Sequence, residues 1–179
     1  MNSSDFSNFL STRVSTRKYN NSSSDPISDS DLEYIINSAS KAPTAGNLES
    51  WDVVCVTDPS ILELLMDAAD SQPQIKESGC VLCVCANYIR AMSRYKERGI
   101  LFAIEDATIV STYMILSAHA LRLQSCWVGQ FDDDEVKNIL GLPPHIRPIS
   151  LLCIGHGEPT FTSQPTRMDI ENHIHYDSW

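Results

Sequence analysis

The sequence predicts a layered α/β domain in which strands and helices alternate along the chain. Short apolar runs with strand character occur at 53–56, 80–86, 125–129 and 149–155. Helical patterns lie between these runs, and 179 residues are enough for one domain with a substantial core. Periodicity alone therefore favours a doubly wound parallel sheet within a single domain that spans residues 1–179.

A polar turn at 20–31 leads into the first long helix, which we expect to begin at Ser28 and to end before Pro43. Ser28 and Asp31 have the spacing of a capping box, and apolar residues then recur at helical intervals. Asp58, which precedes a proline, has the N-cap position of the next helix. Both helix starts are therefore predicted from their capping residues.

The run at 80–86 contains three cysteines and is expected to be a central strand. Alternation along a strand sends Cys83 and Cys85 to one face and Cys80 to the other, which argues against a shared metal ion. The histidines of the stretch 173–175 stand near the end of the sequence without further ligands at metal-site spacing. We therefore expect no metal site, and we expect the six cysteines to be free thiols in a reducing cytoplasm.

The longest apolar stretch, residues 101–121, is expected to be a core or interface helix. Glu105, Asp106 and His119 interrupt it, which argues against a membrane span. Another helix is predicted after the strand at 125–129, with an acidic start and an end at Gly141.

Composition narrows the classes of ligand. The formal net charge is -10 with 13 basic residues, so nucleic acid and anionic membranes are not expected partners. An anionic ligand would have to be held by a local cluster of basic residues. The N-terminal stretch lacks the pattern of a secretory signal, which favours a cytoplasmic location. No dinucleotide fingerprint or P-loop opens a helix.

Three stretches have residue types suited to ligand binding. Arg13, Ser15 and Arg17 could converge on a phosphate, although a solvated basic turn is the simpler interpretation. The small residues at 43–47 fit a close backbone approach or an ordinary tight turn. The turn at 127–130 places a glycine after a strand, which suits a ligand or a normal strand-to-helix connection. Each stretch alone leaves both alternatives open.

Taken in order along the chain, these stretches resemble the FMN-dependent nitroreductase family. The resemblance runs from Phe9 to Trp179 and is carried by "RVSTRKY", "APTAGNLESW", "RYKERGILFAIEDATI", "SCWVGQFDDDEV", "RPISLLCIGHGEP" and "DIENHIHYDSW". It implies an α+β fold, a three-layer sandwich with a mixed central sheet flanked by helices. It also implies an intertwined homodimer with FMN at the subunit interface.

The resemblance also implies a set of residues that contact FMN. Arg13 and Ser15 would hold the phosphate, Arg17 would lie near the N1/O2 edge of the ring, and Arg167 would return to the phosphate. Gln74 would add a polar contact. The full expected set is Arg13, Val14, Ser15, Arg17, Pro43, Thr44, Ala45, Gly46, Asn47, Gln74, Trp127, Val128, Gly129, Gln130 and Arg167. The other subunit would supply residues 43–47 of this set.

The implied activity is that of an oxidoreductase in which NAD(P)H gives a hydride to FMN N5, and a small oxidant such as a nitroaromatic or quinone then takes the electrons. The cofactor carries the chemistry, so no catalytic side chain is expected beyond Arg17, which would stabilise negative charge on the ring. Alternatives are a protein that stores or senses FMN, and a flavin-fragmenting or dehalogenating relative. The chain departs from the family pattern at Glu49, Ser50 and Glu105, where glutamine, proline and glutamine are common.

Overall fold

The core of the protein is a four-stranded sheet with the strand order β1-β2-β4-β3. The computed structural model describes residues 2–20, 26–159 and 167–179, so the polar turn expected at 20–31 lies partly outside the described residues. The strands are β1 (Trp51–Val56), β2 (Cys80–Asn87), β3 (Gln124–Val128) and β4 (Ile146–Gly155). They match the four apolar runs of the sequence.

Every neighbouring pair of these strands is antiparallel, so the doubly wound parallel sheet favoured by periodicity is wrong. The connection from β1 to β2 shows why. Its first helix, α3 (Pro59–Asp67), packs beside the short α4 (Gln74–Glu77), and the chain re-enters the sheet at the end where it left. Among the described residues, parallel pairing is limited to the bridge between Ser15 and Ser125.

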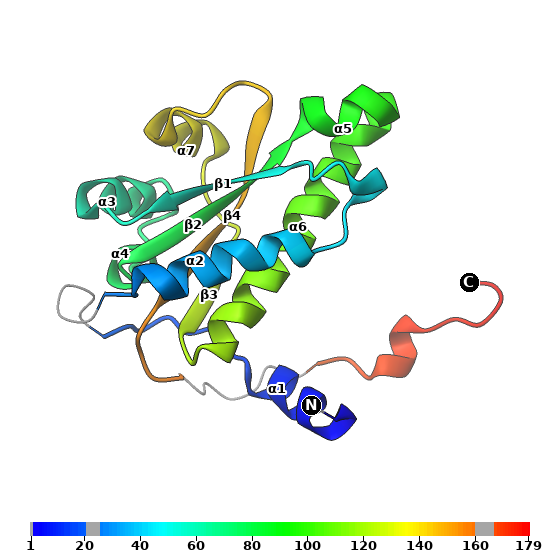
Figure 1. The fold of residues 1–179 in the computed structure, drawn as a ribbon, viewed down its shortest axis with the longest axis horizontal. Helices are drawn as coiled ribbons and strands as arrows, with labels where there is room; N and C mark the ends of the chain where they lie inside the picture. The colour runs from blue at the N-terminus through cyan, green and yellow to red at the C-terminus, as the bar shows by residue number, and fades with distance from the viewer. Residues whose placement is uncertain (1, 21–25, 160–166) are drawn as a thin grey trace.

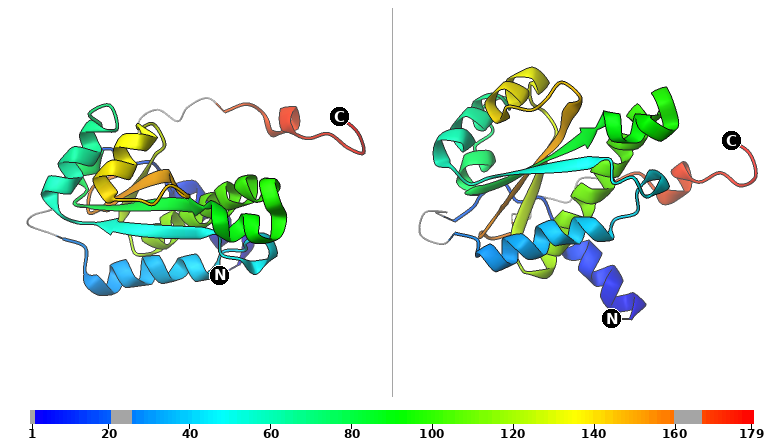
Figure 2. Two further views of the ribbon diagram at one scale, coloured as in Figure 1. Left: turned by 90° about the horizontal axis from the view of Figure 1, so that it is seen from above. Right: turned by 45° about the horizontal axis from the view of Figure 1, so that its top comes forward.

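Helices cover both faces of the sheet, which confirms the three-layer α+β sandwich (Figures 1 and 2). On one face lie α2 (Asp29–Ser38) and α6 (Gly99–Ala120); on the other lie α3, α4 and α7 (Asp133–Leu140). Two separate hydrophobic clusters fill the spaces between the layers. The cysteines of β2 divide between them as predicted, with Cys80 in one cluster and Cys83 and Cys85 in the other. The described residues contain no group of metal-ligating side chains.

The helix ends follow the capping residues. The Ser28 hydroxyl accepts a hydrogen bond from the amide of Asp31 at the start of α2. Asp58 caps α3, and hydrogen bonds from Ser60 lower the pKa of its carboxyl. The last of these helices, α7, ends at Gly141, which has the left-handed conformation of a helix C-cap.

The long apolar helix α6 crosses the sheet and packs against it as a core element. It follows α5 (Tyr88–Tyr95), and by length and composition alone the two together are long and apolar enough to cross a membrane. However, α6 contacts all four strands and buries much of its surface in the domain, as expected of a core helix. Outside the layers, α1 (Ser3–Thr12) and the segment 167–179 project from the body (Figure 1).

Candidate functional site

Residues 13–17 run in extended conformation beside β3, and a threonine fixes them there. The amide of Thr16 donates to the Ser125 carbonyl at 3.0 Å, and its hydroxyl donates to Gln124 Oε1 at 2.9 Å. Thr16 is fully buried, whereas Arg13 and Ser15 on either side are only partly buried. Alternation along the extended segment therefore turns Thr16 inward and leaves the arginine and serine for the opposite side.

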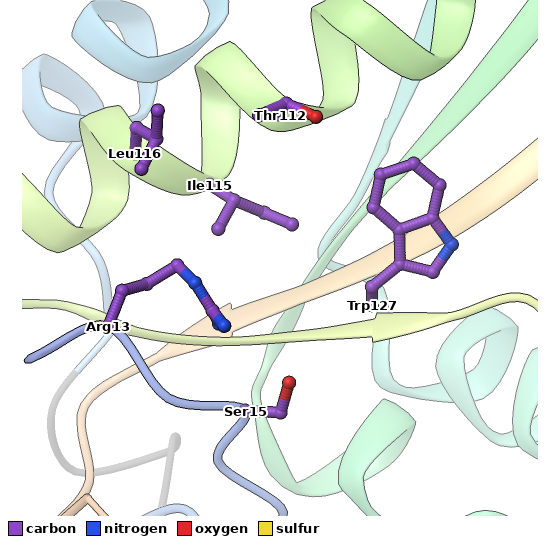
Figure 3. A pocket seen from close by; sticks show the side chains of 6 residues that line it. All are labelled: Arg13, Ser15, Thr112, Ile115, Leu116 and Trp127. Atoms are coloured by element: carbon purple, nitrogen blue, oxygen red, sulfur yellow. The ribbon is translucent and has the colours of Figure 1, made fainter. Parts of the chain in front are cut away.

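Arg13 and Ser15 line a cavity of about 240 Å³ between this segment, α6 and β3 (Figure 3). Its walls are Arg13, Ser15, Thr112, Ile115, Leu116 and Trp127. The segment 13–17 thus contributes a guanidinium and the Ser15 hydroxyl, whereas α6 contributes two aliphatic side chains and Thr112, and β3 contributes the indole of Trp127. This combination suits a ligand with an anionic group and a flat apolar body. Ligand pockets typically occupy roughly 300–1,000 Å³, so the volume of this cavity lies slightly below the usual range.

The positive charge of the two arginines is not neutralised by a neighbouring carboxylate. Over the ranges that the structure describes, no ion pair includes Arg13 or Arg17. Burial raises the pKa of the Cys126 thiol, while Arg17 and Arg13 act in the opposite direction, so both guanidinium groups lie near β3. Unpaired guanidinium groups are good ligands for a phosphate.

The turn after β3 leaves space at its glycine. Gly129 is exposed, and a Cβ there would approach only the Trp127 ring, at an ordinary contact distance of 3.4 Å. Its backbone is not left-handed, so nothing within the chain requires glycine at this position. The missing side chain instead leaves the backbone open to a ligand beside Trp127. Val128, by contrast, points its side chain into the opposite core cluster and could offer only its backbone.

The loop before β2 is joined to this turn through a glutamine that sequence reasoning missed. Gln72 Nε2 donates to the carbonyl of Gln130 at 3.1 Å, and Gln74 Nε2 donates to Gln72 Oε1 at 2.8 Å. Gln74 itself is buried in α4. The expected loop therefore does reach the turn, but the residue that touches the turn is Gln72. No sequence motif distinguishes Gln72 from its neighbours.

Residues 43–47 lie at the other end of α6 from the cavity. Asp106, buried in α6, accepts hydrogen bonds from the amides of Ala45 at 2.8 Å and Ser50 at 3.2 Å. The cavity contacts α6 six to ten residues further on, at Thr112, Ile115 and Leu116, which is about 9–15 Å along the helix axis. Pro43, Thr44, Ala45, Gly46 and Asn47 are absent from the lining of the cavity. Within one chain, the structure does not bring them to Arg13 and Trp127.

The same segment has an unusual backbone. Gly46, Asn47 and Glu49 all have positive φ angles, of 59°, 56° and 49°. At Gly46 a side chain would also collide with the Tyr95 hydroxyl. Such conformations are costly and are concentrated at functional sites. A short 3₁₀ turn, Ala45–Asn47, carries part of this backbone.

One departure from the family pattern has a structural role here. The amide of Ser50 donates to Asp106, and a proline at this position would have no amide hydrogen to donate. The Ser50 hydroxyl itself is buried and has no hydrogen-bond partner within the described part of the chain. The backbone of Ser50, and not its side chain, therefore holds the segment on α6.

Arg167 lies outside the cavity of its own chain. It is exposed at the start of the segment 167–179, which extends away from the sheet (Figure 1). The segment exposes several large apolar side chains, namely Met168, Ile170, Ile174, Tyr176 and Trp179. Arg13, Ser15 and Trp127 are thus brought together, whereas Arg167 and residues 43–47 are not.

Comparison with known proteins gives one consistent result. Residues 10–82 and 70–156 match the model of the Nitroreductase family. A protein of Archaeoglobus fulgidus with the provisional name NADH dehydrogenase/NAD(P)H nitroreductase is 28% identical over 94% of this chain and 95% of its own length. An FMN reductase [NAD(P)H] of Bacillus subtilis is 25% identical, over 87% of this chain and 67% of its own. The structure of Bacillus megaterium NfrA2 superposes with a TM-score of 0.88 at 25% identity, covering all of this chain and 76% of that one.

Proposed function

The chain belongs to the nitroreductase family, and from this premise we propose that it is an NAD(P)H-dependent flavin oxidoreductase with FMN bound at the cavity of Arg13, Ser15 and Trp127. The observation that carries the proposal is the cavity itself, with an unpaired guanidinium on one side and an indole and aliphatic wall on the other. FMN has the matching chemistry, since it joins a phosphate dianion to a flat apolar ring system. Relatives named NAD(P)H nitroreductase and FMN reductase support the same activity.

Different residues of the site would bind different parts of FMN. Arg13 and Ser15 would hold the phosphate, Arg17 would lie at the ring edge that gains negative charge, and the backbone at 127–130 would face the other polar edge. Val14 and Gln74 would contribute contacts from the flanking segments. When bound, FMN supplies hydride transfer between NAD(P)H and an oxidant, so the protein needs no acid–base pair of its own.

A second copy of the chain would complete the site. One end of α6 carries residues 43–47 and the other end contacts the cavity, so two α6 helices that cross antiparallel about a two-fold axis would bring each segment to the partner's cavity. The exposed stripe of α6 that would face the partner consists of Leu101, Glu105, Thr108 and Thr112. The apolar segment 167–179 would pack on the other subunit and return Arg167 to its phosphate. We therefore propose an intertwined, cytoplasmic homodimer of one domain per chain.

Acidic residues near residues 43–50 would affect the reduction potential of FMN and therefore which oxidants it reduces. Glu49 and Glu105 are both exposed at this end of the molecule, where the partner's FMN would lie. Negative charge there disfavours a reduced, anionic flavin and lowers its potential. The enzyme would therefore reduce a small acceptor, such as a quinone or a nitroaromatic, with a stronger driving force than a relative with glutamine at these positions.

Anaerobic titration tests the proposed function. We expect purified protein to be yellow with FMN, to lose its visible absorbance when NADH or NADPH is added, and to regain it with a quinone or nitroaromatic. Flavin that binds but stays oxidised in excess of both nucleotides would instead identify a storage or sensing protein. A protein that remains colourless with added FMN would refute the site altogether.

The proposed contacts to the phosphate and to the ring of FMN can be tested by measuring FMN binding, without measuring turnover. Replacing Arg13 and Arg167 together by alanine should weaken FMN binding by roughly 100- to 10,000-fold, since hydrogen bonds to charged groups contribute about 1.5–3 kcal/mol each. Gly129→Ala should also weaken FMN binding while leaving the unfolding of the flavin-free protein unchanged, because no atom of the chain occupies that space.

Fluorescence titration of FMN measures both effects. Lys76→Ala removes a positive charge from the opposite layer, where Lys76 pairs with Glu63, and serves as the control for net charge. If the arginine variant and the lysine variant bind FMN equally well, the phosphate assignment is wrong.

A further inference from the structure

Three basic residues that the flavin site leaves unused stand within five positions of one another, and we call them the basic cluster. Arg94, Lys96 and Arg98 are exposed between the end of α5 and the start of α6, with Glu97 as the one acidic residue among residues 94–98. In the parts of the chain that the structure describes, none of the three takes part in an ion pair. In a protein of net charge -10, three neighbouring basic residues without an acidic partner within the described ranges are available to bind an anionic ligand.

Aromatic rings hold the two arginines of the cluster without neutralising them. The Arg94 guanidinium lies 5.5 Å from the centroid of the Tyr95 ring, and that of Arg98 lies 5.4 Å from the centroid of Phe102. The two rings pack edge to face at 4.8 Å. A cation–π contact restricts a guanidinium while leaving most of its N–H donors free. The arginines are therefore partly ordered in advance for an anionic ligand.

The cluster borders the segment that the dimer would deliver to the partner's flavin. Arg94 Nη1 donates to the carbonyl of Gly46 at 3.3 Å, and Gly46 packs directly against Tyr95. If residues 43–47 form a wall of the partner's flavin site, the cluster stands at the rim of that site. The position is suitable for the outer part of a molecule whose other end reaches the flavin.

We propose that Arg94, Lys96 and Arg98 bind the 2′-phosphate of NADPH and make the enzyme selective for NADPH over NADH. The inference rests on the proposed function, in which a nicotinamide must reach the flavin while the adenosine end of the same molecule extends outward. The 2′-phosphate is a monoester that carries close to two negative charges, and it is the group that distinguishes the two nucleotides. Exposed arginine and lysine side chains that stand close together in the sequence and have no ion-pair partner among the described residues match it.

Calorimetric titration of the FMN-loaded protein with NADP⁺ and NAD⁺ tests the proposal. We expect NADP⁺ to bind roughly 10- to 100-fold more tightly than NAD⁺, a preference that corresponds to one or two charge-assisted contacts. In the triple variant Arg94→Gln/Lys96→Gln/Arg98→Gln, the two affinities should converge while that for NAD⁺ stays as it was. Adenosine 2′,5′-bisphosphate should compete with NADP⁺ in the unchanged protein only.

A second variant distinguishes the loss of contacts with the 2′-phosphate from a change in the conformation of residues 43–47. Lys96→Gln/Arg98→Gln keeps Arg94 and its hydrogen bond to Gly46, and should still lose most of the preference for NADP⁺. Lys76→Gln, on the opposite layer, should lose none. Equal affinity of the unchanged protein for NADP⁺ and NAD⁺, or an equal loss of both in the variants, would overturn the proposal. Neither result would touch the proposed function, which fails only if FMN does not bind or neither nucleotide reduces it.

Discussion

At the scale of single residues, Asp106 connects the core of the molecule to the segment that, in the proposed dimer, would carry part of the site. It is buried in α6, and each of its carboxylate oxygens accepts one backbone hydrogen bond, from Ala45 and from Ser50. Between them, Asn47 and Glu49 adopt positive φ angles that cost free energy. The two hydrogen bonds fix both ends of this stretch and so help to maintain its conformation.

Asp106→Asn should therefore destabilise the protein. An asparagine side chain can accept one of the two hydrogen bonds but turns an N–H group toward the other amide, which leaves buried donors unsatisfied. We expect a loss of about 1–3 kcal/mol in the free energy of unfolding, measured by urea denaturation. Glu33→Gln, the corresponding removal of a carboxylate at an exposed position of α2, should change it by less than about 0.5 kcal/mol. An Asp106→Asn protein as stable as the Glu33→Gln protein would contradict this role.

The sequence was sufficient to select some of the residues that the structure brings together in the candidate site, and not others. Arg13, Ser15 and Trp127 could be selected because basic, hydroxyl and aromatic residues stood in a recognisable order, and the structure brings them into one cavity. Thr16 and Gln72 could not, because they act by hydrogen bonds to backbone and side-chain groups more than 50 residues away. Such partners become visible only when the fold is known.

At the scale of elements, apolar runs and capping residues were enough to locate the strands and most of the helices, but they did not fix the direction of the strands. The alternation of β2 correctly divided its cysteines between the two faces of the sheet. Strand direction depends instead on where a connection re-enters the sheet. The connection through α3 and α4 returns the chain to the same end, and periodicity contains no signal for this.

The pairing of β1 with β2 also creates a reactive thiol. Cys55 faces Leu82, and Cys80 lies diagonally two residues before Leu82 on the same face. The hydrogen bond between the two thiol groups lowers the pKa of Cys55 to about 7, and the same hydrogen bond, together with burial, raises the pKa of the Cys80 thiol. Because Cys55 is exposed while the other five cysteines are buried, it should be the thiol that reagents reach first.

We expect the rate of alkylation of the native protein by iodoacetamide to rise with pH around a midpoint near 7, and Cys80→Ala to move that midpoint toward the ordinary value of about 8.5. The sign for stability follows from the same shift. Folding favours the thiolate of Cys55, so its contribution to the free energy of unfolding is complete above about pH 8.5 and is lost as the pH falls through 7. Cys55→Ala should abolish the fast reaction. A midpoint unaffected by Cys80→Ala would show that the hydrogen bond does not set the pKa.

At the scale of the whole molecule, the parts of the proposed site lie beside opposite halves of one helix. A single chain has Arg13, Ser15 and Trp127 beside the second half of α6 and residues 43–47 beside its first half. Sequence resemblance implied that two subunits share the site, whereas periodicity and composition contained no trace of it. FMN binding and self-association should therefore be coupled, with each subunit of low affinity alone.

Thr108→Glu tests this coupling at the middle of the exposed stripe of α6. A two-fold axis would place the two introduced carboxylates near each other, and their repulsion and desolvation should favour the monomer. Light scattering should give about 40 kDa for the unchanged protein, twice the chain mass of 20.0 kDa, and about 20 kDa for the variant. The variant should also bind FMN at least about tenfold more weakly, although Thr108 does not line the cavity.

The control is Leu64→Glu, at an exposed apolar position on α3, which should leave both the mass and the affinity for FMN unchanged. A monomeric variant with full affinity for FMN would show that one chain suffices for the site, and the contribution of residues 43–47 from a partner would have to be abandoned.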